Sequence, residues 1–238
     1  MSLADRFAAA FEGSSVAHGQ TTVGNVRKNG KTEAQSYIVR EPMTMDLIKG
    51  HLEGGTGVGS IPINDQNMCK FGALDIDTYP IDHVAILKKC RRFKLPLVVC
   101  RSKSGGAHLF LFTKDWITAT DMRDHLTEFA AVLGYGGCEV FPKQNKILAE
   151  RGDVGNFINL PYFDSENTLR YAVNEKGEEL SLERFLNYVD RVTTTLEDLR
   201  SLDFTSDDDE LKEMPPCLRI MFATSVPDGT RNKVMFHA

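Results

Sequence analysis

An apolar run that ends in two aspartates constrains this chain more than any other stretch. Residues 71–77 read Phe-Gly-Ala-Leu-Asp-Ile-Asp. Because side chains on a β-strand alternate between its two faces, Asp75 and Asp77 project from the same face at the end of a predicted strand. Two carboxylates in one small space repel each other and are costly to desolvate, and a divalent cation such as Mg²⁺ or Mn²⁺ relieves both effects. A pair of solvated acids at a turn is the alternative for this motif taken alone.

The composition is that of a globular protein. The chain has 238 residues, 42% of them hydrophobic and 26% charged, which suffices for one large domain or two small ones with a substantial core. The net charge of −5 argues against a basic coat that binds nucleic acid non-specifically, yet it allows a local basic groove. Lysines and arginines do gather after the aspartates, at positions 88, 89, 91, 92, 94, 101 and 103.

The cysteines and the N-terminus indicate where the protein works. The five cysteines form no C-x-x-C pair and lack closely spaced histidines, so we expect no structural zinc site and a reducing compartment. Residues 1–11 lack the apolar core of a signal peptide, and no apolar run is long enough to cross a membrane. We therefore expect a soluble cytoplasmic protein.

Hydrophobic spacing and capping residues predict a mixed α/β chain. The predicted helices cover residues 3–12, 44–54, 82–95, 118–134, 181–189 and 196–202, and either Thr118 or Thr120 is the N-cap of the fourth. The other predicted strands cover residues 35–40, 97–100, 107–112, 138–141 and 156–162, with a loop or hairpin over 13–34. The glycine-rich stretch 54–60 lacks the lysine of a phosphate-binding P-loop, so it is predicted as a turn before the central strand.

The predicted hairpin turn between residues 101 and 108 carries groups that bind phosphate. Glycines let the backbone approach a ligand, exposed N–H groups form anion nests, and cationic and hydroxyl side chains donate to phosphate oxygens. The turn follows the aspartate strand by one helix and one strand, a connection typical of neighbouring elements. We therefore predict a triphosphate site, although His108 as a core histidine and Lys103 as a solvated cation are alternatives for each residue alone. The donors are Arg101, Ser102, Lys103, Ser104, Gly105, Gly106 and His108.

Glu139 is the candidate third acid. It lies in a predicted apolar strand, where an unpaired carboxylate would be costly, so a metal or a cationic neighbour is expected beside it. A surface acid on an edge strand is the alternative. Three acids, the phosphate-binding turn and nearby Lys143 predict a two-metal site for nucleotidyl transfer.

In their order along the chain, these segments resemble the motifs of the archaeo-eukaryotic primase superfamily, in particular the primase-polymerases of phages, plasmids and mobile elements. The resemblance spans roughly residues 35–165. The similar segments are Asp75-x-Asp77, Ser104-Gly-Gly-Ala-His108, Glu139 with the following Val-Phe-Pro-Lys-Gln, residues 155–162 and residues 51–62.

The resemblance implies an α+β, two-lobed catalytic domain, with an RRM-like sheet in one lobe and the active site between the lobes. It implies that Asp75, Asp77 and Glu139 bind Mg²⁺ or Mn²⁺, although many relatives have aspartate as the third acid. Ser104 and His108, helped by Arg101 and Lys103, would hold the incoming triphosphate. Lys143, Asn156 and Asn159 would line the site.

The same resemblance implies the partners and the division of the chain. The substrates would be NTPs or dNTPs on a single-stranded DNA template with its primer, in DNA replication and beside a helicase domain or partner. A bacterial host cell is implied if a phage or plasmid encodes the protein. We expect a catalytic domain over 1–202, an acidic linker over 203–214 and, over 215–238, the start of a helical primase C-terminal domain that the chain truncates.

Two other functions compete with this one. A nucleotide-sugar glycosyltransferase also holds Mn²⁺ with Asp-x-Asp, but it does not predict the Ser-Gly-Gly-x-His turn. A non-catalytic RRM-like protein would bind nucleic acid through exposed aromatic residues. The aromatic residues here fall mostly in apolar runs.

Overall fold

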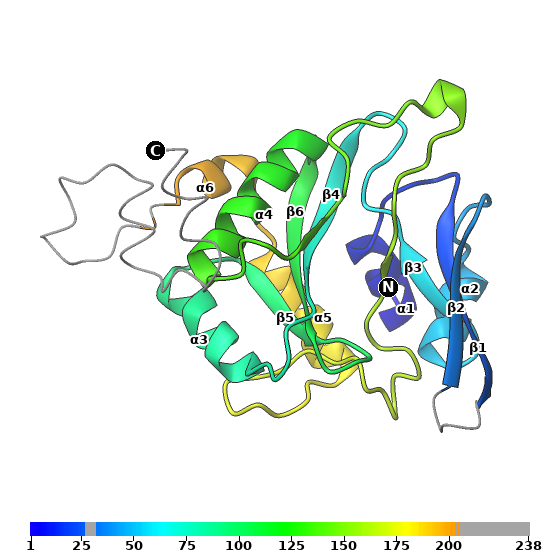
Figure 1. Ribbon diagram of the computed structural model, residues 1–238, viewed down its shortest axis with the longest axis horizontal. Helices are drawn as coiled ribbons and strands as arrows, with labels where there is room; N and C mark the ends of the chain where they lie inside the picture. The colour runs from blue at the N-terminus through cyan, green and yellow to red at the C-terminus, as the bar shows by residue number, and fades with distance from the viewer. Residues whose placement is uncertain (27–31, 203, 205–238) are drawn as a thin grey trace, which may run out of the picture.

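The computed structural model describes residues 1–26, 32–202 and 204 of the chain. These residues form two four-stranded antiparallel sheets, with strand orders β5-β6-β4-β7 and β2-β1-β3-β8. Figure 1 shows the sheets in two lobes, with α1 between them. The prediction of a mixed α/β, two-lobed fold is confirmed.

The first sheet has the RRM-like arrangement that the sequence led us to expect. Its elements follow the order β-α-β-β-α-β, and the first strand lies at the centre between the third and the fourth. The predicted hairpin of β5 and β6 is also confirmed. The elements are β4 (Met68–Ile76), α3 (His83–Arg92), β5 (Leu97–Arg101), β6 (Ala107–Thr118), α4 (Ala119–Leu133) and β7 (Glu139–Phe141).

Capping residues place the ends of the helices in this lobe. The Thr118 side chain accepts a hydrogen bond from the Asp121 N–H and starts α4, and Gly134, with φ of 88°, ends it. Asp82 starts α3 in the same way through the Ala85 N–H. Asp82 begins its helix as predicted, and Thr118 is the N-cap of α4 among the two candidates, Thr118 and Thr120.

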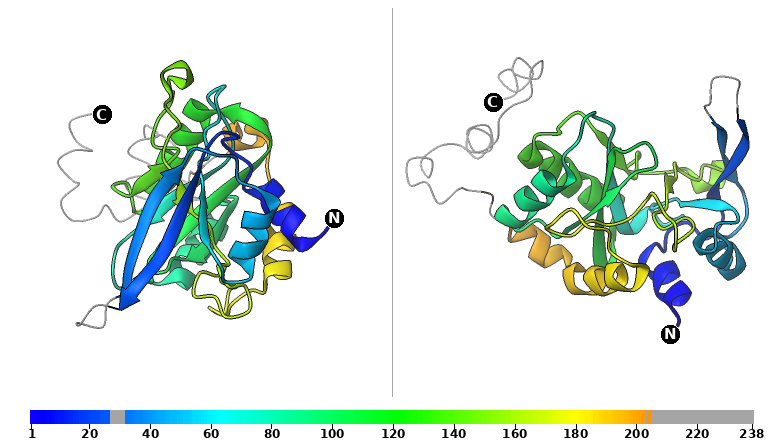
Figure 2. Two further views of the ribbon diagram at one scale, coloured as in Figure 1. Left: turned by 90° about the vertical axis from the view of Figure 1, so that its right-hand side faces the viewer. Right: turned by 90° about the horizontal axis from the view of Figure 1, so that it is seen from below.

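Each face of the first sheet has its own core. Leu74 and Ile76 face α3 and α4, whereas Phe71 and Ala73 point the other way, as alternation along β4 requires. The second face packs against α1 (Leu3–Ala10) and α5 (Leu182–Val192). There Phe11 meets the rings of Phe71, Phe110 and Phe112 edge-on, at centroid distances of 5.2 to 5.4 Å. The two views in Figure 2 show the helices on both sides of this sheet.

The second sheet differs in part from the prediction. It consists of β1 (His18–Val26), β2 (Thr32–Val39), β3 (Gly57–Ser60) and β8 (Ile158–Asn159), beside α2 (Met45–Leu52). The expectation of a turn over 54–60 is wrong for its second half, because residues 57–60 are a buried strand. Glycine is needed at Gly59, where a Cβ would lie 2.4 Å from the Phe157 ring. Of the strand predicted over 156–162, only the two residues of β8 are a strand.

The chain after β8 returns to the first sheet. Residues 171–173 lie along β5, where the Arg101 N–H donates to the Tyr171 carbonyl at 2.8 Å and the Val173 N–H donates to the Val99 carbonyl at 3.1 Å. A short 3₁₀ helix (Ala149–Arg151) and α6 (Leu196–Arg200) complete the elements described. No helix among the described residues is long and apolar enough to cross a membrane.

Only one residue of the expected linker is described. Phe204 is buried, and its ring lies edge-on to Phe129 of α4 at 5.7 Å. The rest of the linker predicted over 203–214, and the C-terminal segment predicted over 215–238, lie outside the described residues.

Candidate active site

Four side chains form one row across the first sheet. In the strand register Cys100 lies opposite His108, His108 opposite Asp75, and Asp75 opposite Glu139. Residues directly opposite each other share a face of the sheet. The row therefore lies on the face that carries Ala73 and Phe110, at the end of the core that this face covers.

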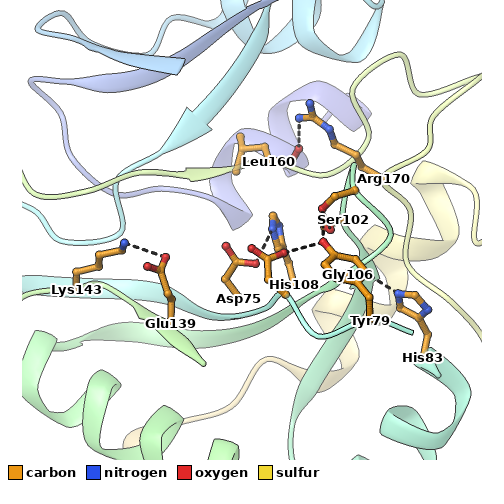
Figure 3. A network of polar contacts seen from close by, with 12 residues as sticks. Asp75, Tyr79, His83, Ser102, Gly106, His108, Glu139, Lys143, Leu160 and Arg170 are labelled. Carbon is orange, nitrogen blue, oxygen red and sulfur yellow. Dashed lines mark hydrogen bonds and ion pairs between the residues drawn. The ribbon is translucent and has the colours of Figure 1, made fainter. Parts of the chain in front are cut away.

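Asp75 stands at the centre of this row with one oxygen lacking a hydrogen bond. Its Oδ1 is buried and lies 3.3 Å from His108 Nε2, close enough for an ion pair (Figure 3). The two atoms are not aligned for a hydrogen bond, and no other described residue offers one to this oxygen. A buried carboxylate oxygen without a donor is costly unless a cation meets it.

Asp77 continues in the same direction beyond the end of β4. The Tyr79 hydroxyl lies 3.0 Å from Asp77 Oδ1 and 2.7 Å from Ser104 Oγ. Ser104 Oγ is in turn 3.2 Å from Ser102 Oγ. A chain of hydroxyl groups thus links the second aspartate to the turn between β5 and β6.

The two glycines of that turn let it close against β4. Gly105 has φ of 92°, which side chains rarely adopt, and a Cβ on Gly106 would lie 2.5 Å from the Ile76 carbonyl oxygen. The Ser102 N–H donates to the Gly106 carbonyl at 2.8 Å, and His83 Nε2 lies 2.9 Å from the same oxygen. Gly105 and Gly106 are therefore explained by contacts within the protein.

The second lobe faces the acids with polar side chains. Thr21 Oγ1 donates to Asn159 Oδ1 at 2.9 Å and lies 3.0 Å from Ser36 Oγ. These three residues come from β1, β2 and β8, which the sheet brings together. Side chains of both lobes enclose a cavity of about 210 Å³. The lining residues are Thr21, Ser36, Asp75, Asp77, Ser102, Lys103, Ser104, His108, Asn159 and Arg170.

The other predicted site residues lie outside this lining. Glu139 Oε2 pairs with Lys143 Nζ at 2.8 Å, and the Lys143 ammonium lies over the Phe141 ring. Arg101 Nη1 donates to the Leu169 carbonyl at 2.8 Å. Asn156 Oδ1 accepts from the Gln144 amide at 2.6 Å. The register thus brings Glu139 beside Asp75, whereas the side chains of Arg101 and Asn156 do not line the cavity.

The expectation that Glu139 lies in apolar surroundings is wrong. Its strand, β7, is the edge strand of the first sheet, and the Glu139 side chain is 59% exposed. A solvated carboxylate needs no metal to offset desolvation. The expected cationic neighbour is nevertheless present, in Lys143.

Sequence reasoning missed three residues of this cavity, Thr21, Ser36 and Arg170, of which Arg170 is the charged one. It is only 7% exposed, and its Nη1 lies 3.5 Å from the Leu160 carbonyl, at the limit of a hydrogen bond. Within the described part of the chain, no carboxylate lies within 4 Å of it. Desolvation lowers the pKa of this guanidinium. Arg170 follows a polar loop beyond the segments that carry the resemblance, so no sequence signal marked it.

The acidic side chains at the site provide some, but not all, of the ligands that a divalent cation needs. No group of three or more histidine, cysteine or acidic side chains among the described residues is gathered tightly enough to hold a metal ion. The unsatisfied Oδ1 of Asp75 and the carboxylate of Asp77 are nevertheless the oxygen ligands that Mg²⁺ and Mn²⁺ take. Glu139 lies opposite Asp75 in the strand register, but its Oε2 pairs with Lys143.

Comparison with known proteins gives one family. The family model described as "TOTE conflict system, Archaeo-Eukaryotic Primase domain" matches residues 7–195, a range that contains every residue lining the cavity. No curated protein matches the chain.

Three solved structures are similar to this one. For the crystal structure of primase RepB′ the TM-score is 0.39 at 8% identity, over 80% of this chain and 60% of that one, so the chain spans about three fifths of its length. For the catalytic domain of RepB′ in complex with initiator DNA, the TM-score is 0.39 at 7% sequence identity. The match covers 84% of this chain and 97% of that one. For the AEP domain of the cyanophage S-2L primase-polymerase, the TM-score is 0.37 at 11% sequence identity. The match covers 74% of this chain and 89% of that one.

Proposed function

Because the chain belongs to the family of archaeo-eukaryotic primase domains from TOTE conflict systems, we propose that it is a template-dependent primase-polymerase. The family supports nucleotidyl transfer of the primase type. The finer proposal is that the chain joins NTPs or dNTPs on a single-stranded DNA template with its primer, in DNA replication and beside a helicase domain or partner. Residues 1–202 would form the catalytic domain.

One observation carries the proposal: acids and a buried arginine line the same cavity without pairing with each other. Asp75 and Asp77 lie on the first lobe, and Arg170 lines the cavity with no carboxylate partner in the described residues. Opposite charges that stay apart in a low-dielectric cavity leave room for a ligand with both signs of charge. A nucleoside triphosphate with its divalent cation has this property.

The residues divide between the cation and the phosphates. Asp75 and Asp77 would hold Mg²⁺ or Mn²⁺, with Glu139 as a third ligand. A divalent cation at this place would neutralise charge on the reacting phosphoryl group. His108 positions the Asp75 carboxylate from 3.3 Å, and the Tyr79 hydroxyl positions Asp77.

The phosphates would meet donors from the turn between β5 and β6 and from the chain segment after β8. Lys103, Ser102 and Ser104 lie on the turn, and Arg170 supplies a buried cation. Charge-assisted hydrogen bonds of this kind are about twice as strong as neutral ones. Asn159 and the hydroxyls of Thr21 and Ser36 remain for the sugar or the base, because they lie on the opposite lobe.

The test is nucleotide incorporation on a single-stranded circular template. Labelled NTPs and dNTPs are supplied separately, with and without a primer, in Mg²⁺ or Mn²⁺. We expect labelled products that depend on the template and that disappear when EDTA removes the metal. A protein that hydrolyses a nucleotide sugar and incorporates no nucleotide would contradict the proposal.

A further inference from the structure

A second cavity lies beyond the chain segment that follows Arg170. Its volume is about 270 Å³, larger than that of the candidate active site. It is formed by residues of α3, of α5 and of the chain after Ala172. The right-hand view of Figure 2 shows the ribbons of these elements from below. The lining residues are Leu87, Arg91, Val173, Asn174, Leu180, Arg184, Asn187, Tyr188 and Arg191.

The cavity is cationic. Three arginines and no acid are among the described residues that line it. Arg91 pairs with Glu175, which lies outside the lining. Arg184 and Arg191 have no carboxylate within 4 Å in residues 1–26 and 32–202. A concave surface with two uncompensated guanidinium groups attracts anions, although the whole chain carries a net charge of −5.

The floor of the cavity is apolar and partly aromatic. Leu87 and Val173 are buried, and the Tyr188 ring lies beneath Arg191, whose guanidinium carbon is 5.1 Å from the ring centroid. A guanidinium stacked on an aromatic ring offers a flat surface, on which nucleobases stack. The arginines supply donors for phosphate beside it. The cavity therefore suits a ligand that combines a flat ring with a phosphate.

The two cavities are close along the chain. Residues 171–173 pair with the edge of β5 in extended form, with Arg170 before them in the first cavity and Asn174 after them in the second. Four extended residues span about 13 Å. Stacked nucleotides rise about 3.4 Å each along a strand, so a strand of a few nucleotides covers this distance.

We propose that the second cavity binds one nucleotide unit, with its phosphate on Arg184 and Arg191 and its base against the Arg191–Tyr188 surface. The inference rests on nucleotides being the substrate class of the proposed function. The unit comes either from a single strand that also reaches the active site or from a free nucleotide. Both sources present the same chemistry to the arginines.

The test compares two double variants. Arg184→Gln with Arg191→Gln removes the two unpaired cations of the cavity. Lys88→Gln with Arg92→Gln removes the same charge from exposed positions of α3 outside the lining. Fluorescence anisotropy measures the binding of short oligo(dT), and calorimetry measures the binding of dTMP and dTTP. Circular dichroism checks that both proteins fold.

We expect the cavity variant to bind oligo(dT) at least about tenfold more weakly, because it loses charged hydrogen bonds to phosphate. The slope of log K against log salt should fall by about 0.7 for each phosphate that the variant no longer neutralises. The α3 control should bind almost as wild type does. Weaker binding of dTMP and dTTP as well would assign the cavity to free nucleotides, and weaker binding of oligo(dT) alone would assign it to a strand.

Wild-type binding of oligo(dT), dTMP and dTTP by a folded cavity variant would overturn the inference. An equally weakened α3 control would overturn it too, because net charge would then explain the effect. These measurements need no catalysis. If the wild type incorporates no nucleotide but the cavity variant binds more weakly than the wild type, the proposed function fails while the second site stands.

Discussion

Arg170 shows at the scale of single residues how the cavity differs from an ordinary protein interior. Burying a guanidinium without a carboxylate partner costs free energy. Here a 3.5 Å contact to the Leu160 carbonyl and the Phe163 ring, whose centroid is 5.6 Å from the guanidinium carbon, offset only part of this cost. Arg101, whose backbone pairs with the residue that follows Arg170, instead has a good side-chain hydrogen bond at 2.8 Å. We infer that Arg170 binds a ligand and that Arg101 has a structural role.

The variant Arg170→Gln should separate binding from stability. We expect the KM for nucleotides to rise by about ten- to a hundredfold, because a charged hydrogen bond contributes roughly 1.5–3 kcal/mol. We also expect the free energy of unfolding to stay the same or rise, because an unpaired buried charge is removed. Steady-state kinetics and urea unfolding measure the two effects.

The matched control is Arg101→Gln, which should lower stability and leave the KM nearly unchanged. If Arg170→Gln destabilises the fold and leaves the KM at its wild-type value, Arg170 has only a structural role.

At the scale of elements, the sequence predicted what local signals determine. Thr118 and Gly134 bound α4 as expected, and β5 with β6 forms the expected hairpin. The strand over 57–60 could not be foreseen, because its glycines are typical of a turn and it is a strand only through its pairing with β1 and β8.

Local sequence patterns likewise predicted some residues of the candidate site and not others. Alternation along β4 predicted that Asp75 and Asp77 share a face, and both line the cavity. The pairing of Asp75 with Glu139 joins strands more than 60 residues apart, so no local pattern fixes that register. The lining by Thr21, Ser36 and Arg170 depends on how the lobes meet, which only the folded chain reveals.

His51 joins three segments and should make the stability depend on pH. Its Nδ1 accepts from the Val58 N–H at 3.0 Å, and its Nε2 lies 2.8 Å from the Pro161 carbonyl. Desolvation of this buried ring lowers the pKa of His51 to about 4. The unfolded chain, with a pKa near 6.5, therefore binds a proton that the folded chain excludes. The contribution of His51 is complete above pH 6.5 and is lost as the pH falls toward 4.

We expect this residue to account for roughly 2 kcal/mol of the free energy of unfolding lost between pH 7.5 and pH 5. Urea unfolding of the wild type and of His51→Gln at both pH values measures it. The variant should be less stable at pH 7.5 and should lose less stability on acidification. An identical loss in both proteins would show that other groups cause it.

At the scale of the whole molecule, two lobes built on separate sheets meet at one cavity. The first lobe supplies the acids and the turn, and the second supplies Thr21, Ser36 and Asn159. The family match favours a primase-type function over the alternative function of a nucleotide-sugar glycosyltransferase. The central claim is that Asp75 and Asp77 together hold the cation on which nucleotide incorporation depends.

The most direct measurement is the rate of template-directed incorporation by Asp75→Asn and Asp77→Asn. The control is Asp115→Asn, which removes an exposed carboxylate of β6 outside the cavity. Because a bound metal contributes several kcal/mol to the transition state, we predict a loss of at least about a thousandfold in each site variant. The control should keep the wild-type rate, and circular dichroism should show all three variants folded. Incorporation at the wild-type rate by either folded site variant would contradict the account.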